Sequence, residues 1–452
     1  ASRTCAYRAM WLAASPFVEG TAVLPCVDVD AAAEWHIAHF GMVETGRTAN
    51  SVTLVRSESE EPAPPPPPPV VLTLGLSKED PDSHGLAVRV TDAAAARAEL
   101  EDNGVKTSNW RIDVRDGRDH QVFFAKEPGG LCYCFYQPLK LIRGLSAFPI
   151  TPQGADGTVD SAALTKLVDR LVAAGVDSIG LLGSTGTYAY LSPEQRAVAI
   201  KTARGVLDAI PKGEPRPKLL VGIGHIRTDC CVELAAAALQ CGADAGLLAP
   251  VSYTPLTDRE VFEHFAAVAR GVPDLPLVIY SNPSTTRFSF SDELVGRLAT
   301  ELGTAVVGLK RGAAPPAADH RGLRAAAVAA VGPRAEDDFC VGCAGDWNIV
   351  EALIVGGEAW FSVLGGIFPE RCQEILEAAR RGDADSARLL HAKMEPLWAV
   401  MRDHGSLRTA YCVLKVSGQL DVAPPRPLLP LAPADEATVA AALQEAELWT
   451  PV

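Results

Sequence analysis

The chain lacks long apolar runs, an excess of positive charge and paired cysteine motifs. No stretch approaches the roughly 18 apolar residues of a membrane-spanning helix, so we expect no membrane partner. The formal net charge is -14, and phosphate backbones require a basic surface, so nucleic acid is not an expected partner. The single Cys-x-x-Cys pair, Cys340 and Cys343, has no second pair to complete a zinc site.

The 11 cysteines are not needed as disulfide staples in so large a chain, so we expect reduced, mostly buried thiols. The first ten residues contain two arginines but no apolar segment followed by a cleavage site. Both observations predict a cytoplasmic protein. The length of 452 residues exceeds what one hydrophobic core usually serves, which predicts two domains.

The first predicted domain, residues 17–138, repeats one pattern with a period of about 60 residues. The first copy has a strand at 20–29, a helix opened by Asp30 and ended by Gly41, and strands at 42–48, 51–56 and 70–76. The second copy has a strand at 84–90, a helix at 92–103, and strands near 105–112, 119–125 and 131–136. The pattern predicts an α+β domain of two βαβββ units. Six consecutive prolines at 64–69 cannot pair in a sheet, so they predict a stiff exposed loop.

The second predicted domain, residues 141–450, has short, continuous apolar runs separated by amphipathic helices. Continuous runs are typical of parallel strands that are buried on both faces. Eight such strands predict a closed (β/α)₈ barrel with a C-terminal helical appendage. The expected strands lie at 145–150, 178–183, 218–224, 245–251, 277–281, 306–310, 339–344 and 359–364. The expected helices lie at 160–174, 192–209, 229–241, 258–270 and 291–302, followed by 369–381, 383–403, 406–417 and 435–448 in the appendage.

Active sites of such barrels lie where the strands end, and three polar features fall there. Lys310 ends an apolar run, and a charged group in a buried place usually has a partner or a task. With a pKa of about 10.4, only about one lysine in 2,500 is neutral at pH 7. Desolvation, helped by a nearby cation such as Arg311, would favour the nucleophilic amine. The other two features are Tyr280 after the fifth strand and the turn of Gly183, Ser184, Thr185, Gly186 and Thr187 after the second.

Each feature alone also has a plain structural interpretation. A lysine at a strand end can extend its amine to solvent, and tyrosines often cap barrel strands for packing. The glycine-rich turn suits a carboxylate at a helix N-terminus, but it is equally a simple connection between a strand and a helix.

Together the motifs, over about 300 residues and in order, resemble the dihydrodipicolinate synthase / N-acetylneuraminate lyase family of class I aldolases and lyases. They are GSTG (183–186), LSPEQR (191–196), YSNP (280–283), GLKRGA (308–313), Gly345-Asp346 and PRP (425–427). The resemblance implies that Lys310 forms an imine with a 2-oxo acid, usually pyruvate, while Tyr280 relays protons. It also implies that Ser184 and Thr185, between Gly183 and Gly186, hold the carboxylate and position the phenol.

The chain departs from the family pattern at three places. Thr187 stands where the family usually has glutamate, and Thr285 stands where dihydrodipicolinate synthases have an arginine for the aldehyde substrate's carboxylate. Arg287, two residues later, is the candidate substitute and is included among the substrate-binding residues. The fourth loop carries Tyr253 with its register shifted by one, as the candidate for the second relay tyrosine.

The first domain resembles the vicinal oxygen chelate superfamily, which includes glyoxalases and bleomycin-resistance proteins, in CVDVDAAAEWHIAHFGM (26–42) and KEPGGLCYCFYQP (126–138). Metal-using members place His or Glu at the first and last strands of each unit. Here His84 occupies one such place, whereas Thr21 and Tyr133 occupy others. A metal site needs at least three ligands, so we expect none here, with a binding or assembly role for this domain. His36, His39 and His120 are expected to be surface or packing residues.

The leading hypothesis is therefore a lyase or aldolase that acts on a 2-oxo acid through Lys310, without a cofactor. A dehydratase of a sugar-derived acid that uses the same lysine is the alternative enzyme. A non-catalytic barrel with a ligand-binding sensor or scaffold domain, or a glyoxalase-type first domain, represents a different class. The expected partners are a small-molecule 2-oxo acid and further copies of the chain in a dimer or tetramer.

Overall fold

The structure is a computed structural model, which describes residues 22–26, 33–34, 42–48, 51–56, 71–76, 85–89, 93–102, 104–109, 111–115, 118–126, 132–154, 156–211, 214–312 and 318–450. The chain divides into two compact units, Ala1–Leu139 and Lys140–Val452. Among the described residues, no helix is both long and apolar enough to cross a membrane.

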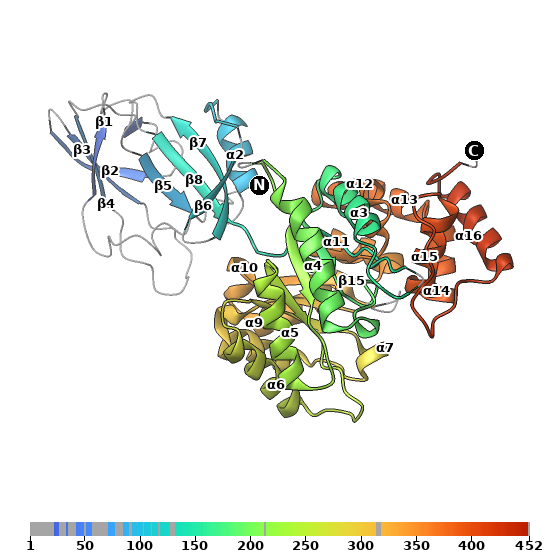
Figure 1. Cartoon of the computed structure of the whole chain (residues 1–452). Coiled ribbons are helices and arrows are strands. Elements are labelled where there is room, and N and C mark those ends of the chain that lie inside the picture. Colours follow the sequence, from blue (N-terminus) through green and yellow to red (C-terminus); the bar gives the residue numbers. More distant parts are fainter. Residues whose placement is uncertain are drawn as a thin grey trace. The chain divides into compact units, whose positions relative to one another are not determined.

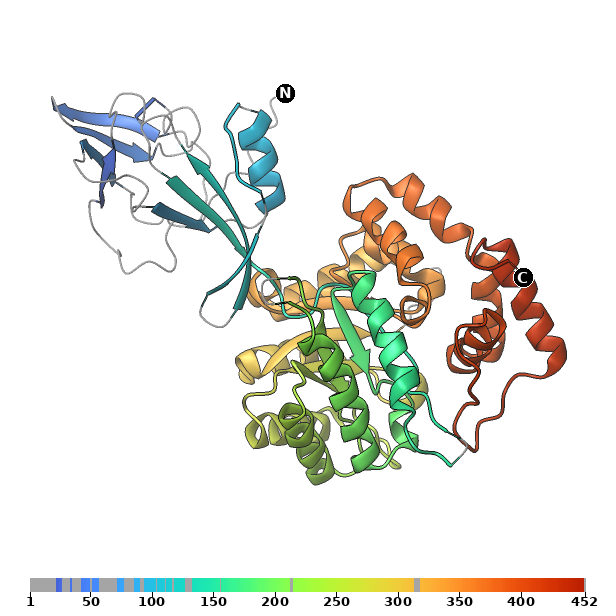
Figure 2. The same cartoon turned by 45° about the horizontal axis from the view of Figure 1, so that its top comes forward.

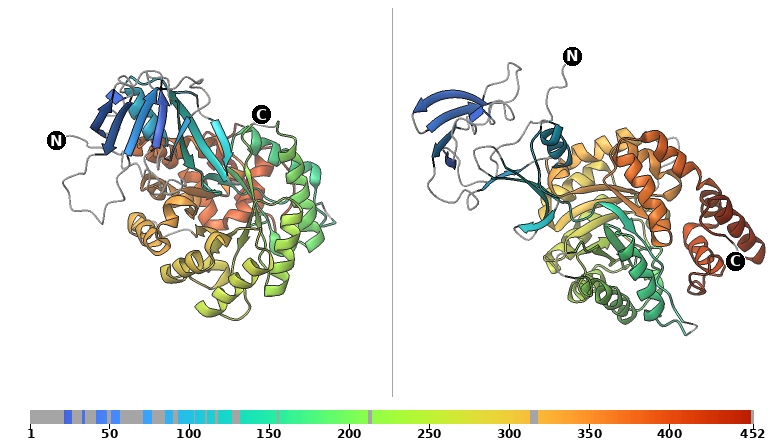
Figure 3. Two further views of the ribbon diagram at one scale, coloured as in Figure 1. Left: turned by 90° about the vertical axis from the view of Figure 1, so that its left-hand side faces the viewer. Right: turned by 90° about the horizontal axis from the view of Figure 1, so that it is seen from above.

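The N-terminal unit contains two four-stranded sheets with the same topology (Figure 3). In each sheet the first strand pairs in parallel with the last, and the remaining pairs are antiparallel. The strand order of the first sheet is β1-β4-β3-β2, and its strands are β1 Ala22–Cys26, β2 Met42–Thr48, β3 Ser51–Arg56 and β4 Val71–Leu76. The strand order of the second sheet is β5-β8-β7-β6, and its strands are β5 Gly85–Arg89, β6 Arg111–Arg115, β7 Arg118–Lys126 and β8 Cys132–Pro138. The repeated strand pattern is thus confirmed, although the strand expected at 105–112 begins only at Arg111.

The helix of the second copy is α2 (Ala93–Asp102), and it packs on its own sheet. Its buried alanines and Leu100 contact Phe123 and Phe135, whose rings stack at 4.9 Å between centroids. Of the first copy's helix only residues 33–34 are described, and the proline run at 64–69 lies outside the described residues.

The C-terminal unit is a closed barrel of eight parallel strands with helices around it (Figure 1). All eight expected strands are present. They are β9 Gly144–Ala147, β10 Ser178–Leu181, β11 Lys218–Gly222, β12 Ala245–Leu248, β13 Leu277–Ser281, β14 Val306–Arg311, β15 Cys340–Ala344 and β16 Ala359–Ser362. Pairing of β16 with β9 closes the ring, so the first strand lies next to the last.

Amphipathic helices connect the strands, and several begin at capping residues visible in the sequence. Asp160 accepts a hydrogen bond from the Ala163 amide at 2.9 Å, and Thr257 forms a reciprocal capping box with Glu260. These helices are α3 Ser161–Ala173, α4 Pro193–Asp208, α5 Thr228–Gln240, α6 Asp258–Gly271, α7 Pro283–Thr286, α8 Asp292–Glu301, α9 His320–Val331, α10 Arg334–Asp337 and α11 Ile349–Ile354.

Helices α14, α15 and α16 of the appendage gather at one edge of this unit, drawn in red in Figure 2. The expected helix at 383–403 is in fact two helices, and Pro396 lies in the first turn of the second, where its missing N–H is tolerated. The appendage consists of α12 Pro369–Arg380, α13 Ala384–Ala392, α14 Glu395–His404, α15 Ser406–Val416 and α16 Pro433–Glu445.

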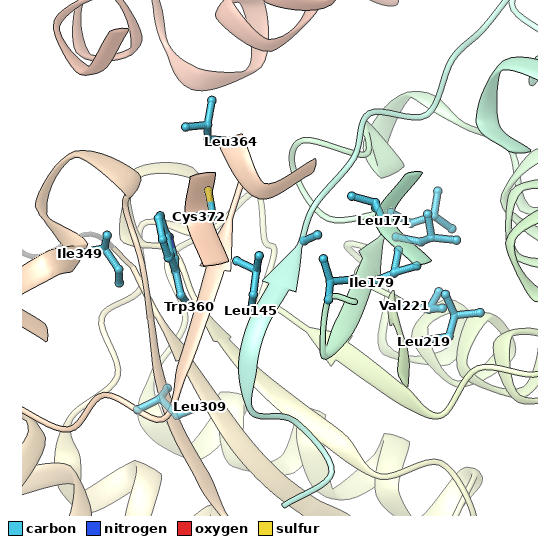
Figure 4. Close-up of a cluster of buried hydrophobic side chains, with 14 of the residues drawn as sticks. Leu145, Leu171, Ile179, Leu219, Val221, Leu309, Ile349, Trp360, Leu364 and Cys372 are labelled. Carbon is cyan, nitrogen blue, oxygen red and sulfur yellow. The ribbon is translucent and has the colours of Figure 1, made fainter. Parts of the chain in front are cut away.

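Two apolar clusters lie on the two sides of the barrel wall. The outer cluster joins strands to helices and includes Leu145, Ile179 and Trp360 (Figure 4). The inner cluster takes alternate residues of the same strands, among them Phe361, together with Phe148 directly after β9, and fills the barrel.

One irregularity of β14 decides which way its lysine points. Leu277 pairs with Val306, but the next residue of β13 pairs with Gly308, so Val307 is an extra residue. Val307 faces the inner cluster and Leu309 the outer one. A regular strand would place Lys310 opposite Ser281, on the outward side, whereas the bulge places it opposite Tyr280.

Candidate active site

The rim where the barrel strands end brings together three of the polar features expected from the sequence. Lys310 and Tyr280 are register partners on the adjacent strands β14 and β13. The turn that follows β10 reaches the same place, because the Ser184 Oγ lies 3.0 Å from the Tyr280 hydroxyl. Parallel strands with a common direction explain why three distant segments meet here.

Lys310 is buried, with 4% of its surface exposed, and aromatic rings surround its amine. The Nζ lies 3.9 Å from the ring centroid of Phe148, 4.2 Å from that of Tyr280 and 5.7 Å from that of Phe361. Burial lowers the pKa of Lys310, while the Tyr280 hydroxyl and the Asp346 carboxyl raise it by smaller amounts. The net effect increases the fraction of neutral amine, which is the nucleophilic form.

Arg311 does not supply the cation that we expected beside this amine. It follows Lys310 on a strand, so its side chain lies on the opposite side of the wall. There its guanidinium forms an ion pair with Asp292 of α8 at 2.8 Å. Desolvation, and not a neighbouring cation, is therefore what lowers the pKa of Lys310.

The Tyr280 hydroxyl is oriented by a short chain of hydrogen bonds. The Ser284 hydroxyl donates to the Asn282 Oδ1 at 2.7 Å, which leaves the Asn282 Nδ2 to donate to the Tyr280 oxygen at 3.0 Å. Because that oxygen accepts from Asn282, its own proton is available to Ser184 or to a group bound at Lys310. The arrangement suits a hydroxyl that donates a proton and recovers one.

The turn of residues 183–187 is held tightly, and its glycines are needed for packing. A Cβ on Gly183 would lie 2.8 Å from the Phe148 ring, and one on Gly186 would lie 2.6 Å from the Leu182 nitrogen. The Gly186 carbonyl accepts a hydrogen bond from Thr151 at 2.8 Å. Within the turn Ser184 is exposed, whereas Thr185 is buried.

Thr187, which replaces the family's glutamate, is buried with a left-handed φ of 56°. A β-branched residue rarely adopts this conformation, so the turn is strained at that position. The strain lies directly beside the proposed carboxylate-binding residues.

Asp346, on the seventh loop, is buried and bonded entirely within the protein. Its carboxylate accepts hydrogen bonds from the Trp360 indole at 2.9 Å and from the Leu364 amide at 2.8 Å. Burial raises the pKa of Asp346, and these hydrogen bonds oppose that effect. The carboxyl thus joins the seventh and eighth loops and contributes to the electrostatic surroundings of Lys310.

Two predicted site residues, Tyr253 and Arg287, do not lie beside Lys310 and Tyr280. Tyr253 is 93% exposed and does not meet Tyr280. Arg287 is exposed, and no described residue forms an ion pair with its guanidinium; it ends α7 with a left-handed φ of 56°. Thr285 is also exposed, and its hydroxyl donates to the Asn282 carbonyl at 3.3 Å.

Sequence reasoning missed three residues that shape the site. Phe148 directly follows the first strand and Phe361 lies in the eighth, and only closure of the barrel brings both against Lys310. Asn282 follows Tyr280 by two residues in the YSNP motif, so its place at a strand end was the available signal.

In the N-terminal unit, Tyr133 is fully buried in the small core, and the buried His120 packs edge-on against Tyr136 at 5.6 Å. Thr21, His36, His39 and His84 lie outside the described residues, so the absence of a metal there stays a prediction. Within the described ranges, no three His, Cys, Asp or Glu side chains form a group that could hold a metal ion.

Comparison with known proteins concerns the barrel unit. The Dihydrodipicolinate synthetase family matches residues 141–446. A 4-hydroxy-tetrahydrodipicolinate synthase from Methylibium petroleiphilum is 30% identical over 310 residues, which cover 69% of this chain and 100% of the relative.

Two solved structures have the same fold. The dihydrodipicolinate synthase from Agrobacterium tumefaciens has a TM-score of 0.63 and 44% identity, and the match covers 68% of this chain and 98% of that one. A prophage protein of the dihydrodipicolinic acid synthase family from E. coli K12, solved in complex with pyruvate, has a TM-score of 0.61 and 26% identity, with 68% and 99% covered. The chain therefore belongs to the dihydrodipicolinate synthetase family, and its barrel is a class I aldolase or lyase of that family.

Proposed function

We propose that the barrel is a lyase or aldolase that binds a pyruvate-type 2-oxo acid as an imine on Lys310. The observation that carries this proposal is the enclosure of the Lys310 amine by three aromatic rings, one of which belongs to Tyr280, its partner on the adjacent strand. A lysine without a functional role would be expected to extend its amine to solvent, because burial of a charged amine costs free energy.

Each residue of the site has a separate role in the proposed formation of the imine. The neutral amine of Lys310 attacks the C2 carbonyl, and the resulting carbinolamine must lose its oxygen as water. Tyr280 donates the proton that this departure requires, and Asn282 holds the phenol in position. Ser184 and Thr185 are proposed to receive the substrate carboxylate, since backbone N–H groups and hydroxyls before a helix favour an anion.

The imine is tested by borohydride trapping with pyruvate, read by intact mass and peptide mapping. We expect one added pyruvate-derived group on the peptide that contains Lys310, and none in Lys310→Ala. Lys218→Ala is the matched control, because Lys218 begins β11 at the opposite end of the barrel, so labelling should persist. An adduct on another lysine, with Lys310→Ala still active, would refute the assignment.

The acceptor substrate, which would react with the bound pyruvate, is proposed to lack a carboxylate of its own. Thr285 cannot replace the charge and planar fork of an arginine, and Arg287 is exposed. A lost charge-assisted contact of about 1.5–3 kcal/mol corresponds to roughly ten- to a hundred-fold in rate. We therefore expect poor condensation of pyruvate with aspartate semialdehyde and improvement in Thr285→Arg. Robust wild-type turnover that collapses in Arg287→Ala would show that Arg287 performs this role.

A dehydratase acting on a sugar-derived acid through the same lysine remains the second candidate. Its support is the neutral polar rim formed by Ser184, Asn282 and Ser284, which offers hydroxyl and amide partners to a polyol. Release of water from a sugar-derived acid, lost in Lys310→Ala, would select this reaction over carbon–carbon cleavage.

For the N-terminal unit we propose a metal-free binding or assembly module of the vicinal oxygen chelate type. Two sheets with the same strand order, each closed by a parallel pair of first and last strands, support this proposal. One tightly held metal ion per chain, lost in His84→Ala, would contradict it. The predicted homo-oligomer is tested by the mass of the full chain in sedimentation equilibrium.

A further inference from the structure

The two phenylalanine rings beside Lys310 pack against glycines of neighbouring strands. A Cβ added to Gly180 would lie 2.3 Å from the Phe148 ring, and one added to Gly342 would lie 2.6 Å from the Phe361 ring. The two rings meet edge to face, with 6.1 Å between their centroids and 72° between their planes. Because a side chain at either glycine would displace a ring, the surrounding strands fix where both rings lie.

The Phe148 ring presents its face to the Lys310 amine. The Nζ lies 3.9 Å from the centroid of this ring, closer than to the ring of Tyr280 at 4.2 Å or of Phe361 at 5.7 Å. The Phe148 amide donates to the Ser362 carbonyl at 2.8 Å, so the pairing of β9 with β16 continues to the residue that carries the ring. A phenylalanine side chain has no polar atom, so its ring face is all that Phe148 offers to the amine.

The dry surroundings of Lys310 favour attack by the neutral amine, but they oppose the cation that the attack produces. Burial lowers the pKa of Lys310, which means that it disfavours a positive charge on Nζ. Among the described residues, no carboxylate forms an ion pair with Lys310. Asp346 acts on it through its charge, but its carboxylate already accepts hydrogen bonds from Trp360 and Leu364. A cation formed on Nζ therefore needs another source of stabilisation.

We propose that Phe148 is a further catalytic residue, whose ring face stabilises the iminium cation formed on Lys310. This inference rests on the proposed imine at Lys310. When the carbinolamine dehydrates, its carbon–oxygen bond breaks, and the oxygen takes the proton of Tyr280 and leaves as water. The nitrogen lone pair completes the carbon–nitrogen double bond, so a positive charge appears on Nζ and C2. An aromatic face within about 6 Å attracts such a cation, most strongly where water is excluded.

The ring acts on the equilibrium only where the charge on Nζ changes. Below the Lys310 pKa, the free ammonium and the iminium are both cations over the same ring, so the attraction cancels from the equilibrium constant. Above that pKa the free amine is neutral, and the attraction favours the iminium alone. The titratable groups that act on Lys310 are the Tyr280 hydroxyl and the Asp346 carboxyl, and a change in Phe148 alters neither.

The experiment replaces Phe148 in the full-length protein by phenylalanines that carry one, two or three fluorine atoms. Fluorine withdraws electron density from the ring face and changes the size of the ring little. Each protein is equilibrated with a series of pyruvate concentrations, a short pulse of borohydride fixes the imine, and intact mass gives the labelled fraction. Above the Lys310 pKa, the pyruvate concentration for half-labelling should rise with each fluorine, by up to about 30-fold for loss of a desolvated cation–π contact. Below that pKa it should stay the same.

The matched control is the same fluorinated series at Phe265. This ring of α6 is fully buried too, but it packs against His264 and Phe290. Its fluorination should leave the half-labelling concentration unchanged at every pH. The variant Phe148→Leu keeps an apolar side chain without a ring face, so it should reproduce the loss above the Lys310 pKa.

A half-labelling concentration that does not respond to fluorine above the Lys310 pKa would overturn the role of Phe148. An equal rise at high and low pH would overturn it as well, because a ring that only fills space acts independently of the charge on Nζ. Absence of any adduct on Lys310 in the wild type would overturn the imine itself, and the role of Phe148 with it. The two failures are therefore distinguishable in one series of samples.

Discussion

Substitution of Tyr280 by phenylalanine should have two opposite effects on imine formation, and their balance should depend on pH. The change removes the hydroxyl that bonds Ser184 and Asn282, each at 3.0 Å, and keeps the ring over Lys310. Loss of a positioned proton donor should slow the reaction by about 10²–10⁴-fold. Loss of the same hydroxyl also lowers the pKa of Lys310, because Tyr280 stabilises the ammonium form.

The second effect partly compensates the first only where the amine is protonated. Below the Lys310 pKa, the lowered pKa of the variant raises its fraction of neutral amine, so part of the loss is offset there. Above that pKa the amine is neutral in both proteins, and the full loss appears. The ratio of wild-type to variant rate should therefore be largest at high pH and smaller at low pH, with the variant's inflection at lower pH.

The assay is single-turnover borohydride trapping with pyruvate across a pH series, read by intact mass. Tyr190→Phe serves as the control and should leave the profile unchanged, because Tyr190 ends the short helix Tyr188–Tyr190 and is 43% exposed. The variant should also lose about 1 kcal/mol of unfolding free energy in urea, since the Asn282 amide loses its acceptor. A ratio that stays constant with pH, or an inflection that moves upward, would refute this account of Lys310.

Three further substitutions test how the site is supported, each by urea unfolding. In Gly342→Ala the new Cβ would lie 2.6 Å from the Phe361 ring, so overpacking should lower the free energy of unfolding by about 1–3 kcal/mol. Displacement of that ring should also slow the trapping of pyruvate on Lys310. Gly205→Ala, in open space within α4, should instead stabilise the protein by about 0.5–1 kcal/mol, and destabilisation there would contradict the packing described. Asp346→Asn should lower the free energy of unfolding by about 1–3 kcal/mol. A carboxamide has only one oxygen in place of the two carboxylate oxygens, so one of the present donors, such as the Leu364 amide, loses its acceptor.

The sequence was sufficient to predict the barrel, because eight continuous apolar runs and their intervening helices are local signals. It also placed Lys310, Tyr280 and Ser184 at one rim, since parallel strands share a direction. It could not identify Phe148 and Phe361 as neighbours of Lys310, because 213 residues separate the two rings in the chain and only pairing of β16 with β9 unites them.

Side-chain direction was the other limit. Arg311 was expected to act on the amine of Lys310, but consecutive strand residues face opposite sides, and Asp292 on α8 binds it there. The exposure of Tyr253 could not be foreseen either, because no periodicity fixes the direction of side chains in a loop. Local pattern thus predicts where a segment ends, whereas tertiary contacts decide what its last side chain meets.

Because β14 contains the extra residue Val307 as a bulge, the direction of its lysine does not depend on the length of the strand. A homologous strand that is one residue shorter, without Val307, would pair regularly with β13 and still present its lysine opposite the tyrosine. Strand length can therefore drift by one residue during evolution while the lysine keeps its place opposite the tyrosine. An alignment that opens a single gap at Val307 marks a loss of the bulge, and gives no reason to infer that the lysine has changed its direction.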